Sequence, residues 1–278
     1  MKRKTKAWNA FFTVILAVIS VFMLLPLVWM VSTALKENSQ VFILPPQWLP
    51  KPIKWSNFVE IFRIAPIGIG IRNSLIIAVC VIPIGMFFTS LAAFAFAKLR
   101  FRGKNVLFLV LLSTCMIPAS VVMIPQFVMF SEIGWVDTLL PLIVPGTMGN
   151  IGAMFFLVQF MKGIPTALIE SAKIDGAGFF MIYRKIIFPL VRPALATQVI
   201  FWFMVIWNDL LGPVLYLNSP EKLTLTAVIA SLNSMYSSQS NYPLIMAGSV
   251  ISIVPLLIIY VIFQRQIIDS LVISGIKG

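Results

Sequence analysis

The sequence contains no histidine, and only 9 of its 278 residues are aspartate or glutamate. Histidine is the usual zinc ligand and general base at neutral pH, so its absence argues against a zinc enzyme or a histidine-dependent hydrolase. The 2 cysteines, Cys80 and Cys115, lie in apolar runs, and two thiolates alone do not complete a metal site. No Gly-rich phosphate loop of the Walker type is present. We therefore expect a chain that binds no metal and does not hydrolyse ATP itself.

Apolar side chains, by contrast, are in excess. They make up 60% of the residues and charged ones only 11%, which is more apolar surface than one soluble core buries. A helix needs roughly 20 apolar residues to cross a hydrocarbon layer about 30 Å thick. Six such runs occur. They predict an all-α polytopic membrane protein with transmembrane helices at Ala10–Leu35, Ser74–Ala97, Val106–Phe130, Leu139–Phe160, Ala194–Leu217 and Leu244–Phe263.

The basic residues predict the orientation of these helices, because Lys and Arg stay on the cytoplasmic side. The third connection, "SEIGWVD", has neither. Both termini are therefore expected in the cytoplasm, and the net charge of +12 is expected to face anionic lipid instead of nucleic acid. Most basic residues lie at the N-terminus, in the second and fourth connections and at the C-terminus: Lys2, Arg3, Lys4, Lys6, Lys98, Arg100, Arg102, Lys104, Lys162, Lys173, Arg184, Lys185, Arg192, Arg265 and Lys277.

Helix-breaking residues interrupt several spans. The fourth span contains Pro141, Pro145, Gly146, Gly149 and Gly152. In a bilayer such breaks persist only where neighbouring helices or a watery cavity satisfy the freed backbone groups. Ordinary kinking explains any single proline, but together the breaks favour a packed, movable bundle over a simple anchor.

The fourth connection begins with "GIPTALIESAKIDGAG", which has proline before a helix-compatible run and glycine after it. This punctuation predicts a short helix over Thr166–Ile174. Ile164, Leu168 and Ala172 recur every four residues and are expected to form its apolar stripe. Asp175 and Gly176 are expected to end the helix, since glycine tolerates the left-handed conformation. A second helical run, "FFMIYRKIIF", leads to Pro189, Pro193 and the fifth span.

The order and spacing of this connection resemble the "EAA" signature of permease subunits of ABC importers, in which Gly is followed ten residues later by Ile and three further on by Pro. Ser171 and Phe188 are mild departures from the pattern. Elsewhere, "PPQWLPKPIKWSNFVEIF", "WND" and "QRQIIDSLVISGIKG" are similar to the carbohydrate-specific, maltose-transporter-like branch, and to its six-span second permease. The residues that match the signature and that it implies for ATPase coupling are Glu170, Ala172, Asp175, Gly176, Ala177, Ile186 and Pro189.

This resemblance implies one permease domain over residues 1–278, with the first span and exported loop at 1–70, the core at 71–264 and a cytoplasmic tail at 265–278. It also implies import of a carbohydrate, such as an oligosaccharide, across a bacterial or archaeal cytoplasmic membrane. The implied partners are a second homologous permease, two cytoplasmic ATPase subunits that use ATP and Mg, and an extracytoplasmic sugar-binding protein. The helix around Glu170–Ala177 would dock in a cleft of the ATPase.

The substrate pathway is expected near Trp207, Asn208 and Asp209, which place an aromatic ring and planar polar groups on one helical turn. The structural alternative is that Asn208 and Asp209 satisfy broken backbone or gate the outer mouth. Two rival functions are an ion-coupled secondary carrier and a non-transporting scaffold. Asp209 alone falls short of the carboxylate or histidine relay that an ion-coupled carrier usually needs.

Overall fold

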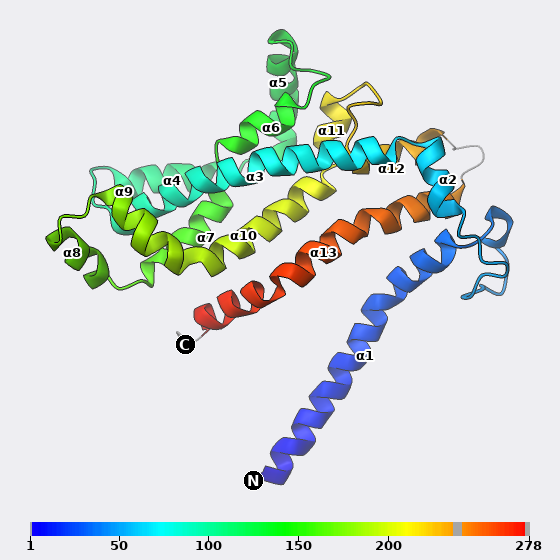
Figure 1. Ribbon diagram of the computed structural model, residues 1–278, viewed down its shortest axis with the longest axis horizontal. Helices are drawn as coiled ribbons and strands as arrows, with labels where there is room; N and C mark the ends of the chain where they lie inside the picture. The colour runs from blue at the N-terminus through cyan, green and yellow to red at the C-terminus, as the bar shows by residue number, and fades with distance from the viewer. Residues whose placement is uncertain (1, 236–240, 276–278) are drawn as a thin grey trace. The chain divides into compact units, whose positions relative to one another are not determined.

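The computed structural model describes residues 2–235 and 241–275, and every regular element in these ranges is a helix (Figure 1). Within these ranges, five stretches are long and apolar enough to cross a membrane: Ala10–Ala34, Ile67–Lys98, Leu140–Lys162, Phe179–Asn208 and Tyr242–Gln266. Helices α4 (Lys104–Thr114) and α5 (Ala119–Glu132) together form a further candidate span, bent by 88°. The predicted polytopic all-α membrane protein is confirmed.

The helices form two compact units. The first contains Met1–Ile67 and Val228–Pro255, and the second contains Gly68–Ala227 and Leu256–Gly278. Helix α13 (Tyr242–Gly275) contributes to both units, and it continues through most of the predicted tail at 265–278. Lys277, expected on the cytoplasmic side, lies outside the described residues. A single permease domain over 1–278 stays a prediction.

In the first unit, a loop fastens the end of the first span. Helix α1 (Lys2–Ala34) ends with carbonyl groups that have no helical donor. Asn57, at the start of α2 (Asn57–Ile64), donates from its side-chain amide to the carbonyls of Ala34 at 2.8 Å and Lys36 at 2.9 Å. The backbone N–H of Lys54 donates to the carbonyl of Leu35 at 2.9 Å. The Lys36 ammonium lies 4.1 Å from the centre of the Trp29 ring.

In the second unit, helices α3 (Ile67–Lys98), α6 (Leu140–Thr147) and α10 (Phe188–Asn208) approach closely because glycine stands at the contact. A Cβ on Gly85 would lie 2.5 Å from the Trp202 ring and 2.6 Å from the carbonyl oxygen of Gly146. Such close backbone approach through small residues is typical of membrane helix pairs. Helix α7 (Ile151–Lys162) packs on α4 through the rings of Phe155 and Phe108, 6.2 Å apart.

Two predicted spans are broken, and proline or glycine stands at each break. Pro118 lacks an N–H, so α4 cannot continue through it, and the third predicted span, Val106–Phe130, is divided between α4 and α5. Between α6 and α7, Gly149 has φ +115°, and Asn150 then caps α7 by accepting from the N–H of Ala153 at 2.8 Å. The N–H of Asn150 donates to the Thr89 hydroxyl at 2.9 Å, which confirms that a neighbouring helix satisfies this break.

The fifth span is displaced from its predicted position at Ala194–Leu217. Helix α9 (Phe179–Ile182), a π-helical turn at Tyr183–Ile187 and α10 form one continuous stretch that ends at Asn208. In the π turn, the N–H of Phe188 donates to the carbonyl of Tyr183. The missing N–H of Pro189 would leave the carbonyl of Lys185 without its α-helical donor, and the wider turn accommodates this. The predicted second helical run is therefore the start of the span.

Asp137 joins two loops of the second unit. It has φ 60°, a left-handed conformation that Asp tolerates better than most residues. Its carboxylate accepts from the N–H of Asn218 at 2.9 Å and that of Ser219 at 2.8 Å, and also from the Ser219 hydroxyl. The Lys222 ammonium lies 3.3 Å from the same carboxylate. The hydrogen bonds from Ser219 and Asn218 hold the pKa of Asp137 well below its ordinary value.

Replacing Asp137 with asparagine is expected to loosen residues 217–224, because the ion pair and part of this acceptor set are lost. Hydrogen exchange of the peptide containing Asn218 and Ser219 is expected to rise by about tenfold. The matched control is Glu132→Gln, since the Glu132 side chain is exposed and makes no hydrogen bond or ion pair within the described part of the chain. Unchanged hydrogen exchange in the Asp137 variant would mean that Asp137 does not hold residues 217–224 in place.

The lowered pKa of Asp137 also fixes the sign of its pH dependence. A carboxylate with a depressed folded-state pKa contributes stability above its unfolded pKa of about 4, and this contribution is lost as pH falls through the lower folded value. Protection of the peptide at 217–224, corrected for intrinsic exchange, is therefore expected to stay constant from pH 8 to about pH 5 and to decline below about pH 4. A decline already between pH 7 and pH 6 would contradict it.

Candidate functional site

Helix α8 (Ala167–Ile174) lies at one end of the second unit, between α7 and α9 (Figure 1). Its bounds match the short helix predicted over Thr166–Ile174. The predicted apolar stripe is wrong in part: Ile169 and Ala172 are buried, whereas Leu168 is exposed. Ile174 is 87% exposed. Helix α8 thus keeps apolar side chains on its open side as well as its packed side.

The C-terminal end of α8 is a Schellman motif, in which a left-handed residue lets two N–H groups close the last turn. The N–H of Gly176 donates to the carbonyl of Lys173 at 3.0 Å, and the N–H of Ala177 donates to the carbonyl of Ala172 at 2.9 Å. Gly176 has φ +79°. The predicted glycine-terminated helix is confirmed. A Cβ on Gly176 would meet no atom within 4 Å, so within this chain only the backbone conformation requires glycine.

Two side-chain hydrogen bonds join the segments that flank α8 to the long helix α3. Before α8, the Lys98 ammonium donates to the carbonyl of Ile164 at 2.6 Å. After α8, the Tyr183 and Ser90 hydroxyls are hydrogen-bonded at 2.7 Å in a buried position. The ring of Tyr183 also packs on that of Phe94, with centroids 5.7 Å apart. The segments before and after α8 are therefore both hydrogen-bonded to α3.

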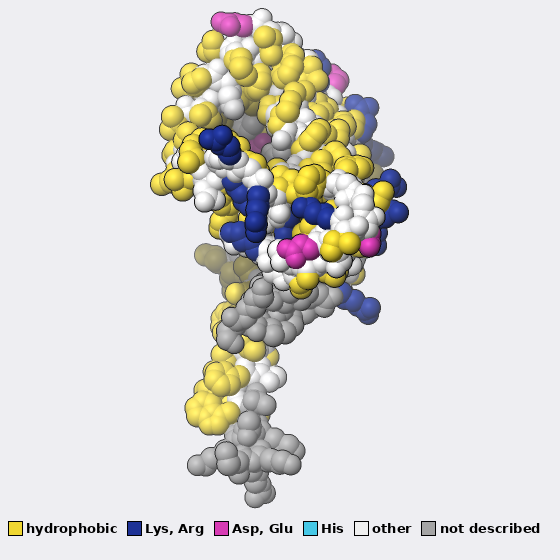
Figure 2. Space-filling view, turned by 90° about the vertical axis from the view of Figure 1, so that its left-hand side faces the viewer, with side chains coloured by type: hydrophobic (Ala, Val, Ile, Leu, Met, Phe, Trp, Pro, Cys, Tyr) yellow, Lys and Arg dark blue, Asp and Glu magenta, His cyan; other side chains and the backbone are white. Residues whose placement is uncertain are grey.

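A hollow of about 400 Å³ lies beside α8, and we call it the α8 hollow. Both acidic and basic side chains line this hollow. The Lys173 ammonium lies over the Phe179 ring, 4.9 Å from its centre. Figure 2 shows that Lys and Arg side chains gather on this end of the second unit. The surface around α8 is thus hollowed, mostly basic and partly apolar. The α8 hollow is lined by Lys98, Leu99, Arg100, Phe101, Thr166, Ile169, Glu170, Lys173 and Phe179.

The residues expected to couple to an ATPase do not share one surface. Ala172 is buried inside the chain, so it can support α8 but does not present its side chain to a partner. Ile186 lies half-buried in the π turn, and Pro189 lies exposed at the start of α10. Ala177 is half-buried just after the Schellman turn. Of the seven residues, those that lie exposed on or next to α8 are Glu170, Asp175 and Gly176.

The residues expected along a substrate pathway stand at the break between α10 and α11 (Leu211–Tyr216). Trp207 is fully buried and stacks on Phe203 with ring centroids 5.3 Å apart. The side-chain amide of Asn208 donates to the carbonyl of Met204 at 2.7 Å, within its own helix. These two side chains are therefore engaged with the protein itself, and substrate contact by them stays a prediction.

Asp209 makes the contacts expected if it satisfies broken backbone instead of binding a substrate. Asp209 has an extended backbone after the end of α10, so its carbonyl has no α-helical donor, and it accepts from the Thr226 hydroxyl. The Asp209 carboxylate accepts from the N–H of Gly212 at 3.3 Å. This break ends α10 at Asn208, so the predicted continuation of the span to Leu217 is wrong.

Sequence reasoning missed Ser90, Tyr183 and Lys98 as residues that hold the site. Tyr183 and Lys98 stand near or within predicted connections, but each bonds to a residue more than 60 positions away. No local periodicity or punctuation signals such pairs. A buried hydroxyl on a membrane helix, such as that of Ser90, gives a weak signal, because it needs a partner there.

Comparison with known proteins supports the permease family that the sequence pattern resembles. Residues 82–272 match the family described as "Binding-protein-dependent transport system inner membrane component". The arabinooligosaccharides transport system permease protein AraQ of Halalkalibacterium halodurans is 34% identical over 286 residues, covering 100% of both chains. The trehalose transport system permease protein SugB of Mycobacterium tuberculosis is 33% identical, covering 99% of both.

A solved structure has the same fold. It is a chain of a bacterial ABC transporter involved in the import of the acidic polysaccharide alginate, with a TM-score of 0.80 and 22% identity over 95% of this chain and 97% of that one. The helix order, the short helix α8 with its glycine-terminated end and the match over residues 82–272 lead to one assignment. This chain belongs to the inner membrane components of binding-protein-dependent transport systems.

Proposed function

We propose that this chain is a permease subunit of an ATP-driven importer for carbohydrates, and for oligosaccharides in particular. The observation that carries the substrate class is the full-length similarity to a permease named for arabinooligosaccharides, at 34% identity. The similarity to a trehalose permease supports the same class. The imported sugar is delivered by an extracytoplasmic binding protein, as the family description implies.

Helix α8 supports a coupling role with a cytoplasmic ATPase. It lies between two membrane-spanning stretches, Leu140–Lys162 and Phe179–Asn208, and leaves Leu168 and Ile174 uncovered. The ATPase holds ATP and Mg, and its closure moves α8. The bonds from Lys98 to Ile164 and between Ser90 and Tyr183 carry this movement to α3. Rigid-body rocking of packed helices is a common form of alternating access.

The complete importer contains a second homologous permease and two ATPase subunits or domains. Both termini of this chain face the cytoplasm of a bacterium or archaeon, with α8 on the same side. The unequal distribution of Lys and Arg among the connections supports this orientation. The sugar passes near the break between α10 and α11, where Trp207, Asn208 and Asp209 line or shape the path.

Affinity purification tests this assembly. The tagged chain, extracted in mild detergent, is expected to retain a second permease and an ATPase, and mass spectrometry identifies both. In proteoliposomes with the binding protein outside, oligosaccharides are expected to stimulate ATP hydrolysis several-fold, while amino acids serve as the control solutes. No stimulation by any glycan would contradict the carbohydrate assignment.

The same proteoliposomes separate an importer from an ion-coupled carrier or a scaffold. Uptake is expected to require enclosed ATP and Mg and to survive ionophores that collapse ion gradients. Uptake that continues without ATP but stops with an ionophore would identify an ion-coupled carrier. Uptake unaffected by omission of this chain would identify a scaffold.

A further inference from the structure

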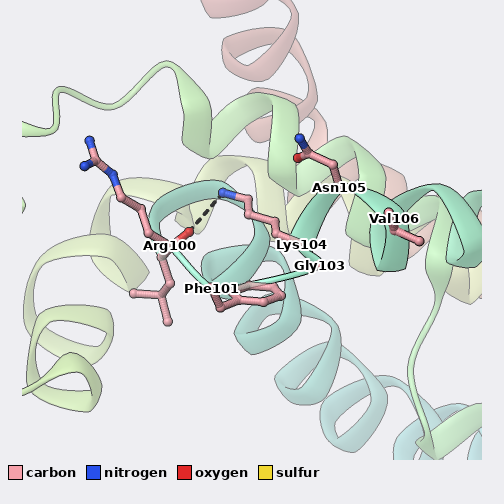
Figure 3. Close-up of a pocket in the computed structure, with 7 residues that line it drawn as sticks. Arg100, Phe101, Gly103, Lys104, Asn105 and Val106 are labelled. Carbon is pink, nitrogen blue, oxygen red and sulfur yellow. Dashed lines mark hydrogen bonds between the residues drawn. The ribbon is translucent and has the colours of Figure 1, made fainter.

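A second hollow of about 420 Å³ lies where α3 ends and α4 begins, and we call it the loop hollow. Figure 3 shows the polar ends of Arg100 and Asn105 on one side of the loop, opposite the ring of Phe101. The Lys104 ammonium donates to the carbonyl of Leu99 at 3.0 Å and so lies folded back over the loop (Figure 3). The residues that line the loop hollow are Leu99, Arg100, Phe101, Gly103, Lys104, Asn105 and Val106.

The cations of the loop hollow lack a counter-ion among the described residues. The salt bridge found in that part of the chain joins Lys222 and Asp137, which lie in other loops. Arg100 is exposed and makes no hydrogen bond or ion pair with another described residue. Lys104 uses one of its three N–H donors on a neutral carbonyl. An anion in the loop hollow would therefore find at least two cationic groups with donors to spare.

The hollow opens next to an apolar helix face. One side of α4 packs inward, where the ring of Phe108 contacts those of Phe96 and Phe155. The other side leaves Val106 and Leu109 each 69% exposed. Eleven residues of helix span roughly 16 Å, which is about half of a hydrocarbon layer of about 30 Å. Helix α4 thus has about the length of one lipid leaflet, with the basic hollow at its N-terminal end.

We propose that the loop hollow binds the phosphate headgroup of an anionic phospholipid whose acyl chains lie along Val106 and Leu109. Two features favour a lipid over free phosphate or a protein. Spans end at Lys98 and begin at Lys104, so the loop lies at the membrane surface, where basic pockets between helices bind anionic headgroups. The adjoining side chains of α4 are apolar from Val106 to Leu112 and suit acyl chains.

The bound lipid lies close to α8. Leu99, Arg100 and Phe101 line both the loop hollow and the α8 hollow. A headgroup held by Arg100 therefore fixes one wall of the α8 hollow.

The test compares two double variants of the complete purified complex in nanodiscs that contain phosphatidylglycerol and phosphatidylcholine. Arg100→Gln with Lys104→Gln removes both cations of the hollow. Arg102→Gln with Lys162→Gln is the control, because it removes equal charge from exposed residues that do not line either hollow. Native mass spectrometry measures the bound phosphatidylglycerol. We expect about a 30-fold loss of its affinity in the first variant, since each of the two hydrogen bonds that Arg100 and Lys104 donate to the phosphate contributes roughly fivefold, and little change in the control, whose residues do not line the hollow.

Equal retention of phosphatidylglycerol by the two variants would overturn the proposal. Displacement of the bound lipid by inorganic phosphate at millimolar concentration would also overturn it and would identify a free-anion site. Retention of phosphatidylcholine and phosphatidylglycerol to the same extent would exclude headgroup charge as the determinant.

A photocrosslinker at Leu109 gives a test that leaves the basic residues intact. Leu109 is exposed on the lipid-facing side of α4, so its crosslinker is expected to form adducts with labelled phosphatidylglycerol. An adduct with a protein subunit in place of lipid would overturn the proposal and would assign this face to a subunit interface. This result is independent of how well the double variant folds.

Discussion

Replacing Gly176 with leucine is expected to abolish sugar uptake while the protein still folds and inserts into the membrane. Gly176 has φ +79°, and an L-residue with a Cβ in this conformation is destabilised by about 1–2 kcal/mol, a roughly 5- to 30-fold shift in population. The strain opens the Schellman bonds to Lys173 and Ala172, which shape the exposed end of α8. Uptake and ATP hydrolysis in proteoliposomes measure the effect, and we expect hydrolysis that no longer drives uptake. Normal uptake would contradict the coupling role.

The variant Gly176→Asn separates two causes of the expected loss of uptake, namely strain in the backbone and obstruction by the added side chain. Asn adopts the left-handed conformation more readily than other non-glycine residues, so Gly176→Asn preserves the turn but adds a side chain. Since a Cβ there meets no atom of this chain within 4 Å, loss of uptake in the Asn variant would locate the obstruction in a partner. Gly178→Leu is the matched control, because Gly178 has φ −70° and equally open surroundings. It is expected to transport normally.

Replacing Gly85 with valine is expected to prevent assembly of the second unit. Even the first added carbon would lie 2.6 Å from the carbonyl oxygen of Gly146 and 2.5 Å from the ring of Trp202. The carbonyl belongs to the backbone of α6, and Trp202 is buried, so neither group can yield without moving a helix. Overpacking of a well-filled core typically costs about 1–3 kcal/mol, and a backbone contact adds to it. We expect about a tenfold fall in folded protein recovered from membranes.

Gly68→Val is the control for this prediction. Gly68 lies on the same helix, α3, and a Cβ there meets nothing within 4 Å. Fluorescence-detected size-exclusion chromatography of both variants measures the amount of monodisperse protein. Wild-type recovery of Gly85→Val would mean that α3 and α6 do not approach as closely as described.

Local features of the candidate site could be predicted from the sequence. Pro165 and Gly176 mark the ends of α8, because restrictions on proline and the left-handed freedom of glycine act within a few residues. The side on which α8 packs could not be predicted in the same way. The four-residue spacing of Leu168 and Ala172 indicated one face, but Ile169 and Ala172 face inward, because the neighbouring helices decide which side is covered. The tie from Tyr183 to Ser90 joins residues 93 positions apart, beyond any local pattern.

By itself, the sequence determined that this is an all-α membrane protein with a short glycine-terminated helix between its fourth and fifth spans, and it pointed to the permease family. These properties depend on the length of apolar runs and on residues that act locally. Only the tertiary structure decided the 88° bend between α4 and α5, the end of α10 at Asn208 and the fastening of two loops by Asp137. Proline and glycine permit a break, but the direction of the chain after it depends on distant groups that accept or donate the freed hydrogen bonds, as Thr226 does for Asp209.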